Sequence, residues 1–306
     1  MDRTELRPRP DSDSVIAAWR QRPAPRVGAS AHALTVDVED YFQVEAFARV
    51  IDRDSWPSRE CRIEANVGRI LDLFAAAGAR GTFFTLAWIA ERYPRLIRTI
   101  VDSGHELASH GTEHRRADHQ SAEEFFGDVA HSKRVLEDIS GRAVKGYRAP
   151  CFSLTRASLW LPEALARAGY RYSSSLYPIV HDAYGIPEAP RFAFHPLDGS
   201  DFLEIPVSSA RLMGRNWPCG GGGYFRLLPY ALNRMALDTV ASRDRRPLVF
   251  YFHPWEIDPA QPRIAAPLKS RLRHYTNLAT MEKKLARLLA AFRWRRMDEV
   301  FLGGAA

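Results

Sequence analysis

The feature that most constrains the fold of this chain is a regular alternation of short apolar runs with segments of helical period. Runs of strand length lie at 33–42, 81–88, 106–110, 146–150, 170–176, 202–208 and 247–255. Between most of them, apolar residues recur at i, i+3, i+4 and i+7, as Val67, Ile70 and Phe74 do. Repeated strand–helix units imply parallel strands joined by crossover helices. The pattern therefore predicts an α/β fold, a distorted (β/α) barrel of about seven parallel strands in a single domain.

Residues that start and stop helices agree with this division. Ser121 and Glu124 have the spacing of a capping box, in which each side chain accepts a hydrogen bond from a backbone N–H group. Four glycines follow helical patterns, where a left-handed residue commonly ends a helix: Gly78, Gly104, Gly141 and Gly169. Residues 178–200 are predicted to form a long loop, and residues 209–228 an irregular insertion. The glycine run 220–223 lacks the Lys-Ser/Thr of a phosphate-binding loop, so we expect a flexible lid there.

The N-terminal segment is predicted to be mobile and the rest of the chain to be folded. Residues 1–30 carry arginines, prolines and acids but no apolar core of signal-peptide length, and we expect a mobile N-terminal arm. Residues 31–306 are expected to form the barrel domain together with its C-terminal extension. Three scattered cysteines give neither a C-x-x-C metal site nor a disulfide framework, which favours reduced thiols and a cytoplasmic location.

Composition and charge limit the class of protein. Hydrophobic residues at 46% and charged residues at 26% are ordinary for a globular protein, and no run of ~18 apolar residues predicts a transmembrane helix. The net charge of +7 would suit phosphate-rich partners, but no nucleic-acid-binding motif accompanies it. We therefore expect a solvated basic surface and no nucleic-acid partner. An anionic substrate or a membrane surface stays open.

Polar residues gather at the predicted carboxyl ends of the strands, where the functional groups of parallel α/β barrels lie. Asp37, Glu39 and Asp40 close the first apolar run. Later strand ends carry further candidates: His110, His114, Arg148, the serines at 173–175 and His253. Charged residues scattered over a protein surface would not fall repeatedly at the ends of predicted strands. The sequence therefore predicts a functional site at this end of the barrel.

His110 and His114 lie four residues apart, which suggests a shared metal ion. On a helical turn this spacing puts both imidazoles on one face. The pattern H-x-x-x-H is weak by itself. The acidic cluster at the end of the first run strengthens it, because it supplies the carboxylate of a site with two histidines, one acid and open positions for water and substrate.

In this order, the motifs resemble those of the NodB-type polysaccharide deacetylases, carbohydrate esterase family 4. They are Thr-x-Asp in the first run, His-Gly-x-x-His, Arg-x-Pro, a serine-rich strand and a histidine after a late apolar run. The longer stretches TVDVEDYFQVEAF, GYRAPCFS, PCGGGGYFR and FYFHPWE look like the branch found beside exosortase and exopolysaccharide gene clusters. The resemblance covers roughly residues 33–290.

The resemblance implies a role for each matching residue. Asp37 matches the catalytic base of the family, and Arg148 matches the arginine that holds the base carboxylate. His110 and His114 match the metal-binding histidines, and His253 matches the general acid. In this chemistry the base takes a proton from water, and the acid protonates the departing amine.

Two motifs depart from the family pattern. Val38 stands where the family has a metal-binding aspartate, and a valine cannot bind metal. Glu39 is the favoured replacement because it lies on the same strand face as Asp37, and Asp40 is the alternative. Ser173 occupies the place where an aspartate commonly precedes two serines, which leaves open how the neighbouring histidine is oriented.

Further residues are predicted to bind substrate. Flat aromatic rings stack on pyranose faces, which points to Trp217, Tyr224 and Trp255, with ordinary core packing as the alternative. Tyr147 and Ser174, which lie within the Arg-x-Pro and serine-rich stretches, are also predicted to contact substrate.

The resemblance implies a hydrolase that removes N-acetyl groups from amino sugars of an exopolysaccharide or of its lipid-linked precursor. It implies one divalent metal ion as cofactor, with Zn first and Co, Ni or Mn as alternatives. The expected partner is an N-acetylated oligo- or polysaccharide. The expected location is the cytoplasm, with peripheral association at the inner membrane face or with exopolysaccharide assembly proteins as an option.

Two other functions stay open. A non-catalytic saccharide-binding or assembly protein on the same fold would explain the altered first and fourth motifs. A hydrolase of small cyclic amides, similar to allantoinase, resembles this fold but often lacks the metal histidines, so His110 and His114 argue against it. Metal content distinguishes a binding protein from an enzyme, because a binding protein need not hold one ion per chain.

Overall fold

The structure of the chain is a computed structural model that describes residues 11–303. One sheet forms its centre, and every pair of neighbouring strands in that sheet is parallel. β1 lies between β9 and β2, and the order continues through β3, β4 and β5 to β6. The strands are β1 (His32–Val38), β2 (Thr82–Thr85), β3 (Glu106–Ser109), β4 (Gly146–Tyr147), β5 (Tyr172–Ser173), β6 (Leu203–Glu204), β9 (Val249–Phe252) and β10 (Trp294–Arg295). The predicted α/β barrel of parallel strands is confirmed.

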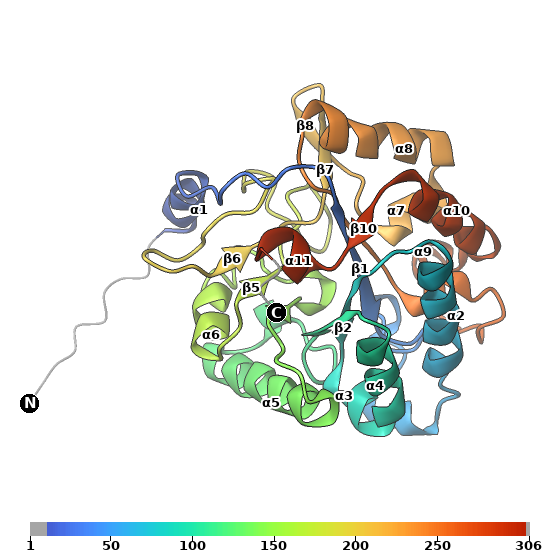
Figure 1. Cartoon of the computed structure of the whole chain (residues 1–306). Helices are drawn as coiled ribbons and strands as arrows, with labels where there is room; N and C mark the ends of the chain where they lie inside the picture. Colours follow the sequence, from blue (N-terminus) through green and yellow to red (C-terminus); the bar gives the residue numbers. More distant parts are fainter. Residues whose placement is uncertain (1–10, 304–306) are drawn as a thin grey trace, which may run out of the picture.

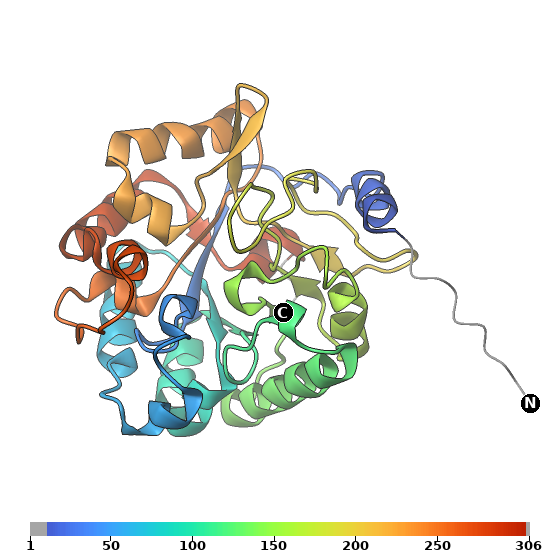
Figure 2. The ribbon, with the colours of Figure 1, turned by 180° about the vertical axis from the view of Figure 1, so that it is seen from behind.

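Helices surround this sheet on its outside, as Figures 1 and 2 show. They are α2 (Ile63–Ala76), α3 (Ala87–Arg92), α4 (Pro94–Asp102), α5 (Ala122–Ser140), α6 (Leu161–Arg167), α7 (Gly222–Leu227), α8 (Tyr230–Asp238), α9 (Leu268–Tyr275), α10 (Leu278–Ala291) and α11 (Met297–Phe301). The predicted capping box of Ser121 and Glu124 begins α5, and Gly141 ends it at a φ of 64°. Within residues 11–303, no helix is long and apolar enough to cross a membrane.

The two faces of β1 explain how the sheet separates the core from the site. Leu34 and Val36 point outward into the apolar layer that α2 and α10 cover. Thr35 and Asp37 point the other way, and both accept hydrogen bonds from the fully buried Arg148. Side chains alternate in direction along a strand, so one apolar run supplies both the packing layer and a polar interior.

The barrel is closed by irregular segments between β6 and β9. The backbone N–H of Ser208 donates to the carbonyl of Val249 at 3.2 Å, and the N–H of Tyr251 donates to the carbonyl of Gly220 at 2.8 Å. A Cβ atom on Gly220 would lie 2.4 Å from the carbonyl oxygen of Val249. The prediction of a flexible glycine lid is therefore wrong, since the glycines at 220–222 are buried where two backbones approach closely.

Residues 209–228 contain regular structure that the sequence did not reveal. β7 (Ser209–Leu212) and β8 (Arg215–Pro218) form an antiparallel hairpin, and α7 follows it. The hairpin turns at Met213 and Gly214, both with positive φ. Its strands are largely exposed and lack a continuous apolar run, which is why the pattern indicated only an irregular insertion.

The N-terminal segment is more ordered than predicted. Helix α1 (Ser12–Arg20) buries Ile16 and Trp19, and the Trp19 ring lies 5.3 Å from that of Phe194. The prediction of a mobile arm is thus wrong for residues 12–20, because two apolar side chains one turn apart anchor the helix. Residues 21–30 follow the domain surface, where the Ala24 N–H donates to the Ala193 carbonyl at 3.0 Å. Residues 1–10 of the predicted arm and the last residues of the domain, 304–306, lie outside the described residues.

Candidate active site

The carboxyl ends of β1, β3 and β9 bring five predicted site residues to one cavity. Asp37, Glu39, His110, His114 and His253 all line it, and its volume is about 540 Å³. Parallel strands end on the same side of a sheet, so residues that are distant in sequence converge there. The polar strand ends of the sequence thus belong to a single site.

Arg148 lies behind Asp37 in the barrel interior. Its Nη1 donates to Asp37 Oδ1 at 2.6 Å and to Thr35 Oγ1 at 2.8 Å. Its Nε and Nη2 donate to the carbonyl and the hydroxyl of Ser174 at 3.0 and 2.9 Å. The second oxygen of Asp37, Oδ2, lies 4.0 Å from His253 Nε2. Arg148 therefore fixes one carboxylate oxygen and leaves the other facing the cavity.

Glu39, His110 and His114 form a donor set that could hold a metal ion. Each offers one ligand atom, these atoms lie within 4.8 Å of one another, and all three residues are buried. Glu39 Oε2 accepts no hydrogen bond from the described residues, although His114 Nε2 lies 2.7 Å from it. A buried carboxylate oxygen without a donor is costly, and a bound cation would stabilise it. Two imidazoles and one carboxylate fit a divalent ion with open coordination positions.

The orientation of His110 supports a ligand role. Its Nδ1 lies 2.8 Å from the carbonyl oxygen of Arg148, which can only accept, so Nδ1 carries the proton and the lone pair of Nε2 faces the cavity. Burial lowers the pKa of His110 to about 4, which keeps the ring neutral. The turn between the two histidines needs positive φ at Gly111 (78°) and at His114 (53°). A non-glycine residue in this conformation is strained, and such strain clusters at functional sites.

Asp40, the alternative metal ligand, faces away from this donor set. Its carboxylate accepts hydrogen bonds from the backbone N–H of Tyr41 at 2.7 Å and of Arg62 at 2.5 Å. It fixes the loop that follows β1 instead. The acid beside the two histidines is Glu39, as the strand alternation from Asp37 favoured.

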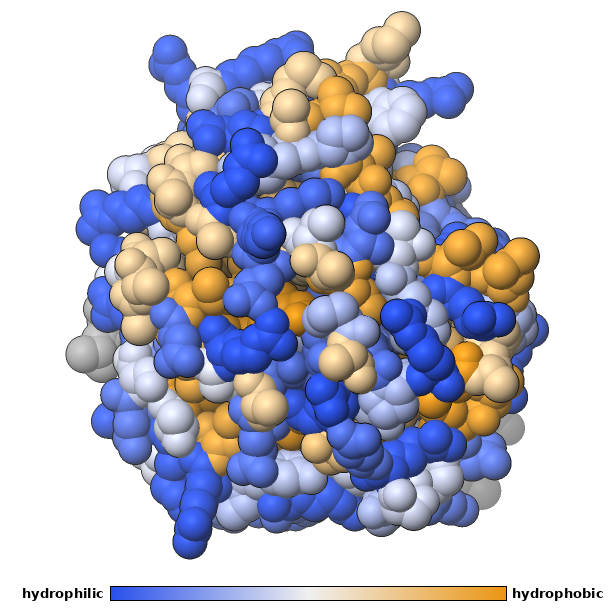
Figure 3. Space-filling view, turned by 90° about the vertical axis from the view of Figure 1, so that its right-hand side faces the viewer, coloured by the Kyte–Doolittle hydropathy of each residue, from blue (hydrophilic) through white to orange (hydrophobic). Residues whose placement is uncertain are grey.

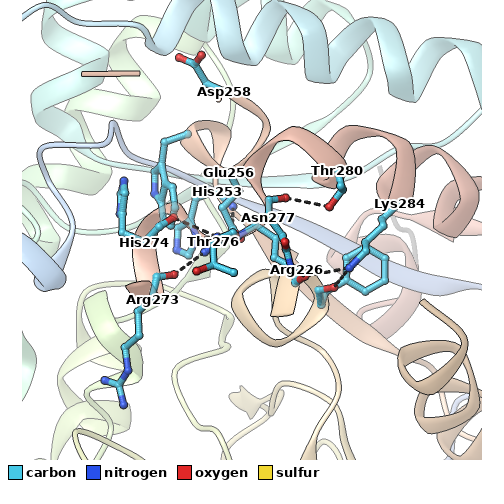
Figure 4. Close-up of polar contacts among 12 residues, drawn as sticks. Arg226, His253, Glu256, Asp258, Arg273, His274, Thr276, Asn277, Thr280 and Lys284 are labelled. Carbon is cyan, nitrogen blue, oxygen red and sulfur yellow. Dashed lines mark hydrogen bonds and ion pairs between the residues drawn. The ribbon is translucent and has the colours of Figure 1, made fainter. Parts of the chain in front are cut away.

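His253 is held by a buried ion-pair network. Its Nδ1 lies 2.8 Å from Glu256 Oε1, and Arg226 Nε lies 2.6 Å from Glu256 Oε2. Figure 4 shows these side chains in line, from Arg226 on α7 to His253 at the end of β9. Glu256 and Arg226 are 0% and 1% exposed. The network directs His253 Nε2 toward Glu39 Oε1, 3.3 Å away.

Two features place Glu256 and Arg226. Gly222, the first residue of α7, has no side chain, and a Cβ atom there would lie 2.3 Å from Glu256 Oε1. The Arg226 guanidinium also donates to the carbonyls of residues 273, 274 and 276, where α9 ends. Figure 4 shows this end of α9 converging on Arg226. Helices α7 and α9 are therefore joined to the histidine through one buried cation.

The charges in this group shift two pKa values in opposite directions. Burial by itself lowers the pKa of His253, but the negative charges of Glu39, Glu256 and Asp37 outweigh it and raise that pKa to about 9. Burial by itself raises the pKa of Glu256, but Arg226 and His253 outweigh it and lower that pKa to about 2. At neutral pH His253 is therefore protonated and Glu256 ionised.

The serine-rich strand supports the backbone around the site. Ser173 Oγ donates to Ser175 Oγ at 2.7 Å, and Glu204 Oε1 accepts two backbone N–H groups beside Ser175. None of these atoms contacts His253. Orientation of that histidine, which the missing aspartate at position 173 left open, is supplied by Glu256 from the opposite side.

Of the five predicted substrate-binding residues, only Trp255 lines the cavity. Tyr147 is buried in the core, and the hydroxyl of Ser174 accepts a hydrogen bond from Arg148. Trp217 is 53% exposed on the hairpin, and Tyr224 is half-buried outside the lining. Tyr147 and Ser174 have almost no exposed surface to offer a substrate, and contact of Trp217 or Tyr224 with substrate stays a prediction.

The residues that hold His253 were not predicted from the sequence. Glu256 had a detectable signal, because His253-Pro-Trp-Glu256 has the spacing of one tight turn, and the two side chains meet across it. Gly222 and Arg226 stand in the stretch PCGGGGYFR, whose resemblance to the family branch marked them out. Nothing in that stretch indicated their contact with Glu256, because they lie about thirty residues earlier and reach it only through the packing of α7.

Comparison with known families matches two adjoining segments of the chain. Residues 53–173 match the family described as polysaccharide deacetylase, and residues 174–302 match one described as a domain of unknown function (DUF3473). The first segment is thus similar to polysaccharide deacetylases. Both matched segments contribute to the one sheet of this chain, because β2, β3 and β4 lie in the first, and β6, β9 and β10 in the second. The second segment also contains His253, Glu256 and Arg226.

Individual proteins are also similar to this chain or to part of it. A peptidoglycan deacetylase of Helicobacter pylori is 28% identical over 113 residues, which are 37% of this chain and 38% of that protein. The chain thus spans little more than a third of this curated relative. A protein from Mycobacterium smegmatis, described as a candidate polysaccharide deacetylase, has a TM-score of 0.61 at 19% identity and is covered to 94%, with 92% of this chain. The Puue allantoinase has a TM-score of 0.57 at 16% identity, over 90% of each chain. These two structures show the shared fold.

Proposed function

We propose that this chain is a metal-dependent deacetylase that removes N-acetyl groups from amino sugars of an exopolysaccharide or of its lipid-linked precursor. One observation carries the proposal. Asp37, paired with Arg148, and His253, paired with Glu256, face the same cavity as the donor set of Glu39, His110 and His114. A base, an acid and a metal-binding group at one point are the parts that hydrolysis of an unactivated amide requires.

The two protein groups would move protons at defined atoms. Asp37 Oδ2 is free because Arg148 occupies Oδ1, so Oδ2 accepts a proton from the attacking water. His253 Nε2 carries a proton that Glu256, across the ring, helps to retain, and it protonates the departing amine nitrogen. A divalent ion held by Glu39, His110 and His114 would supply a Lewis acid that polarises the amide carbonyl and acidifies water.

The match of residues 53–173 to polysaccharide deacetylases and the relatives support the substrate class. The curated relatives include peptidoglycan deacetylases and peptidoglycan-N-acetylglucosamine deacetylases, which are named for N-acetylated saccharides. From the names of these relatives we infer that the substrate of this chain contains N-acetylhexosamine units. Exopolysaccharide as its source is proposed from the resemblance of the longer motifs, and zinc as the metal from the resemblance to the family. A cytoplasmic location is proposed from the scattered cysteines.

The experiment is acetate release from a panel of N-acetylhexosamine oligomers, with and without a chelator. We expect the wild-type chain to release acetate and the chelator to abolish the release. Asp37→Asn should lower the rate by ~10²–10⁴-fold, the usual contribution of a general base, while the metal content stays unchanged. Asp198→Asn, a change at a side chain that is 89% exposed, is the matched control and should keep the wild-type rate.

Two outcomes would decide against the proposal. Metal-free chain with no acetate release on any oligomer would favour the non-catalytic saccharide-binding alternative. A wild-type rate in Asp37→Asn would show that Asp37 is not the base.

A further inference from the structure

Large apolar side chains that are exposed to solvent fall into two groups within the described residues. One group consists of Val50, Val180, Leu268 and Leu272, which are 44%, 83%, 68% and 57% exposed. We call these four residues the rim face. The other group lies on the β7–β8 hairpin, α7 and α8: Met213, Trp217, Leu227, Leu228, Leu232 and Met235.

The rim face borders the mouth of the catalytic cavity. Val50 lines the cavity itself, and Val180 precedes the lining residue His181. Leu268 and Leu272 lie one turn apart on α9, and other residues of that helix, such as Lys269, form part of the cavity wall. Three separate segments of the chain thus present apolar side chains around one opening.

The leucines stand on a helix that is firmly held. Arg226 binds the carbonyl groups at the end of α9, and Lys269 and Arg273 pair with Asp182 on the facing loop at 2.8 and 3.0 Å. Exposed leucines on an anchored helix cannot turn inward to escape water. Their exposure is therefore built into the fold, and it costs solvation unless an apolar partner covers them.

Basic side chains accompany the rim face. Arg49, Lys269 and Arg273 line the cavity, and Arg271 lies on α9 between the two leucines. Arg116 also lines the cavity and pairs with Asp118, so of the four lining cations only Arg49 has no acidic partner within ion-pair distance among the described residues. Figure 3 views the side on which Figure 1 places α9 and α10, and apolar residues stand there among charged ones. Apolar side chains interspersed with Lys and Arg are typical of surfaces that bind anionic membranes.

We propose that the rim face docks on a bilayer containing anionic phospholipid, so that the cavity opens toward the membrane surface. The substrate would then be a saccharide attached to a membrane lipid, whose sugar end enters the cavity while its lipid end stays in the leaflet. The choice of substrate rests on the proposed deacetylase function. Docking itself depends only on the rim face, because the apolar side chains and the basic groups would contact lipid and headgroup directly.

Vesicle co-sedimentation of the full chain tests the docking. The vesicles are phosphatidylcholine alone and an equal mixture of phosphatidylcholine with phosphatidylglycerol, without any saccharide. We expect binding to the mixed vesicles that weakens with added salt, since the charge attraction is screened. The double variant Leu268→Ser, Leu272→Ser should bind roughly tenfold to a hundredfold more weakly. The matched control is Leu232→Ser, Met235→Ser on α8, which exchanges two exposed apolar residues of the second group and should bind as the wild type does.

The outcomes separate docking from catalysis. The α9 variant should release acetate from a water-soluble N-acetylated oligomer at the wild-type rate, which also shows that it is folded. If that variant fails to fold, Val180→Ser carries the same test on the facing loop. The docking proposal is overturned if the wild-type chain does not bind the mixed vesicles. It is also overturned if the α8 control loses vesicle binding while the α9 variant keeps it. Vesicle binding without any acetate release would overturn the proposed function and leave the docking intact.

Discussion

A methyl group at position 222 tests whether the network behind His253 contributes to the reaction. In Gly222→Ala, the new Cβ would lie 2.3 Å from Glu256 Oε1 and 2.8 Å from Oε2. An ordinary contact is 3.4 Å or longer, so the carboxylate must retreat by about 1 Å. Its bonds to His253 (2.8 Å) and Arg226 (2.6 Å) cannot both survive that movement.

The expected loss follows from this displacement. Misplacing a catalytic group by about 1 Å costs on the order of 10²-fold in rate, so we expect kcat for acetate release to fall by that factor. The metal content should not change, because Glu39, His110 and His114 stand on other strand ends. Strain in the packed interior should lower the free energy of unfolding by about 1–3 kcal/mol.

Gly223→Ala is the control, since it places the same methyl group one residue further along α7. No atom lies within 4 Å of the Cβ position there. Alanine is favoured over glycine in a helix by up to about 1 kcal/mol, so this variant should keep the wild-type kcat and unfold at a slightly higher denaturant concentration. A wild-type kcat in Gly222→Ala, or an equal loss in both variants, would refute the positioning role of Glu256.

Three further predictions concern single buried groups. Glu39→Gln should lose most of its bound metal by elemental analysis while Asp40→Asn keeps it, and equal contents would contradict the assignment of Glu39. Arg148→Met leaves Asp37 buried without its cation, so denaturant unfolding should show a loss of about 3–5 kcal/mol, and a loss below about 1 kcal/mol would contradict that reading. Burial raises the pKa of Glu204 from 4.5 to about 7, so the folded chain keeps a proton that the unfolded chain has released. The free energy of unfolding therefore falls as pH rises between these values, by at most about 3 kcal/mol, and Glu204→Gln should gain stability relative to the wild type from about pH 5 to about pH 8 in denaturant titrations.

The boundary between the two family matches divides the candidate active site along the chain. The segment matched as polysaccharide deacetylase contains both metal-site histidines and Arg148, but not the strand with Asp37 and Glu39. The segment matched as a domain of unknown function contains His253 and the residues that hold it. Asp37 and Glu39 lie before residue 53, outside both matched segments, so neither segment contains the whole site.

Local patterns were sufficient for the fold and for most of the site. The seven apolar runs became strands because a parallel sheet buries both faces of each strand, which leaves a continuous apolar signature. His110 and His114 were recognisable because one short turn holds both of them. Asp37 and Glu39 were paired correctly because strand alternation depends only on the backbone.

Partners that are distant in sequence were decided by tertiary structure. Nothing near Asp40 in the sequence showed that two backbone N–H groups, one of them from Arg62, would turn its carboxylate away from the histidines. The run 220–223 suggested a flexible lid, and it became a tight contact because β9 packs against its backbone.

The barrel, the two adjacent histidines and the acidic residues at the end of the first strand could be predicted from local sequence, since each depends on residues within one turn or one strand. Only the tertiary structure decided how His253 is held. Its network joins Gly222 and Arg226 on α7 with Glu256 after β9, and the end of α9 closes around it. Hydrogen bonds and ion pairs act over a few ångströms, so such a set exists only once the chain has brought these elements together.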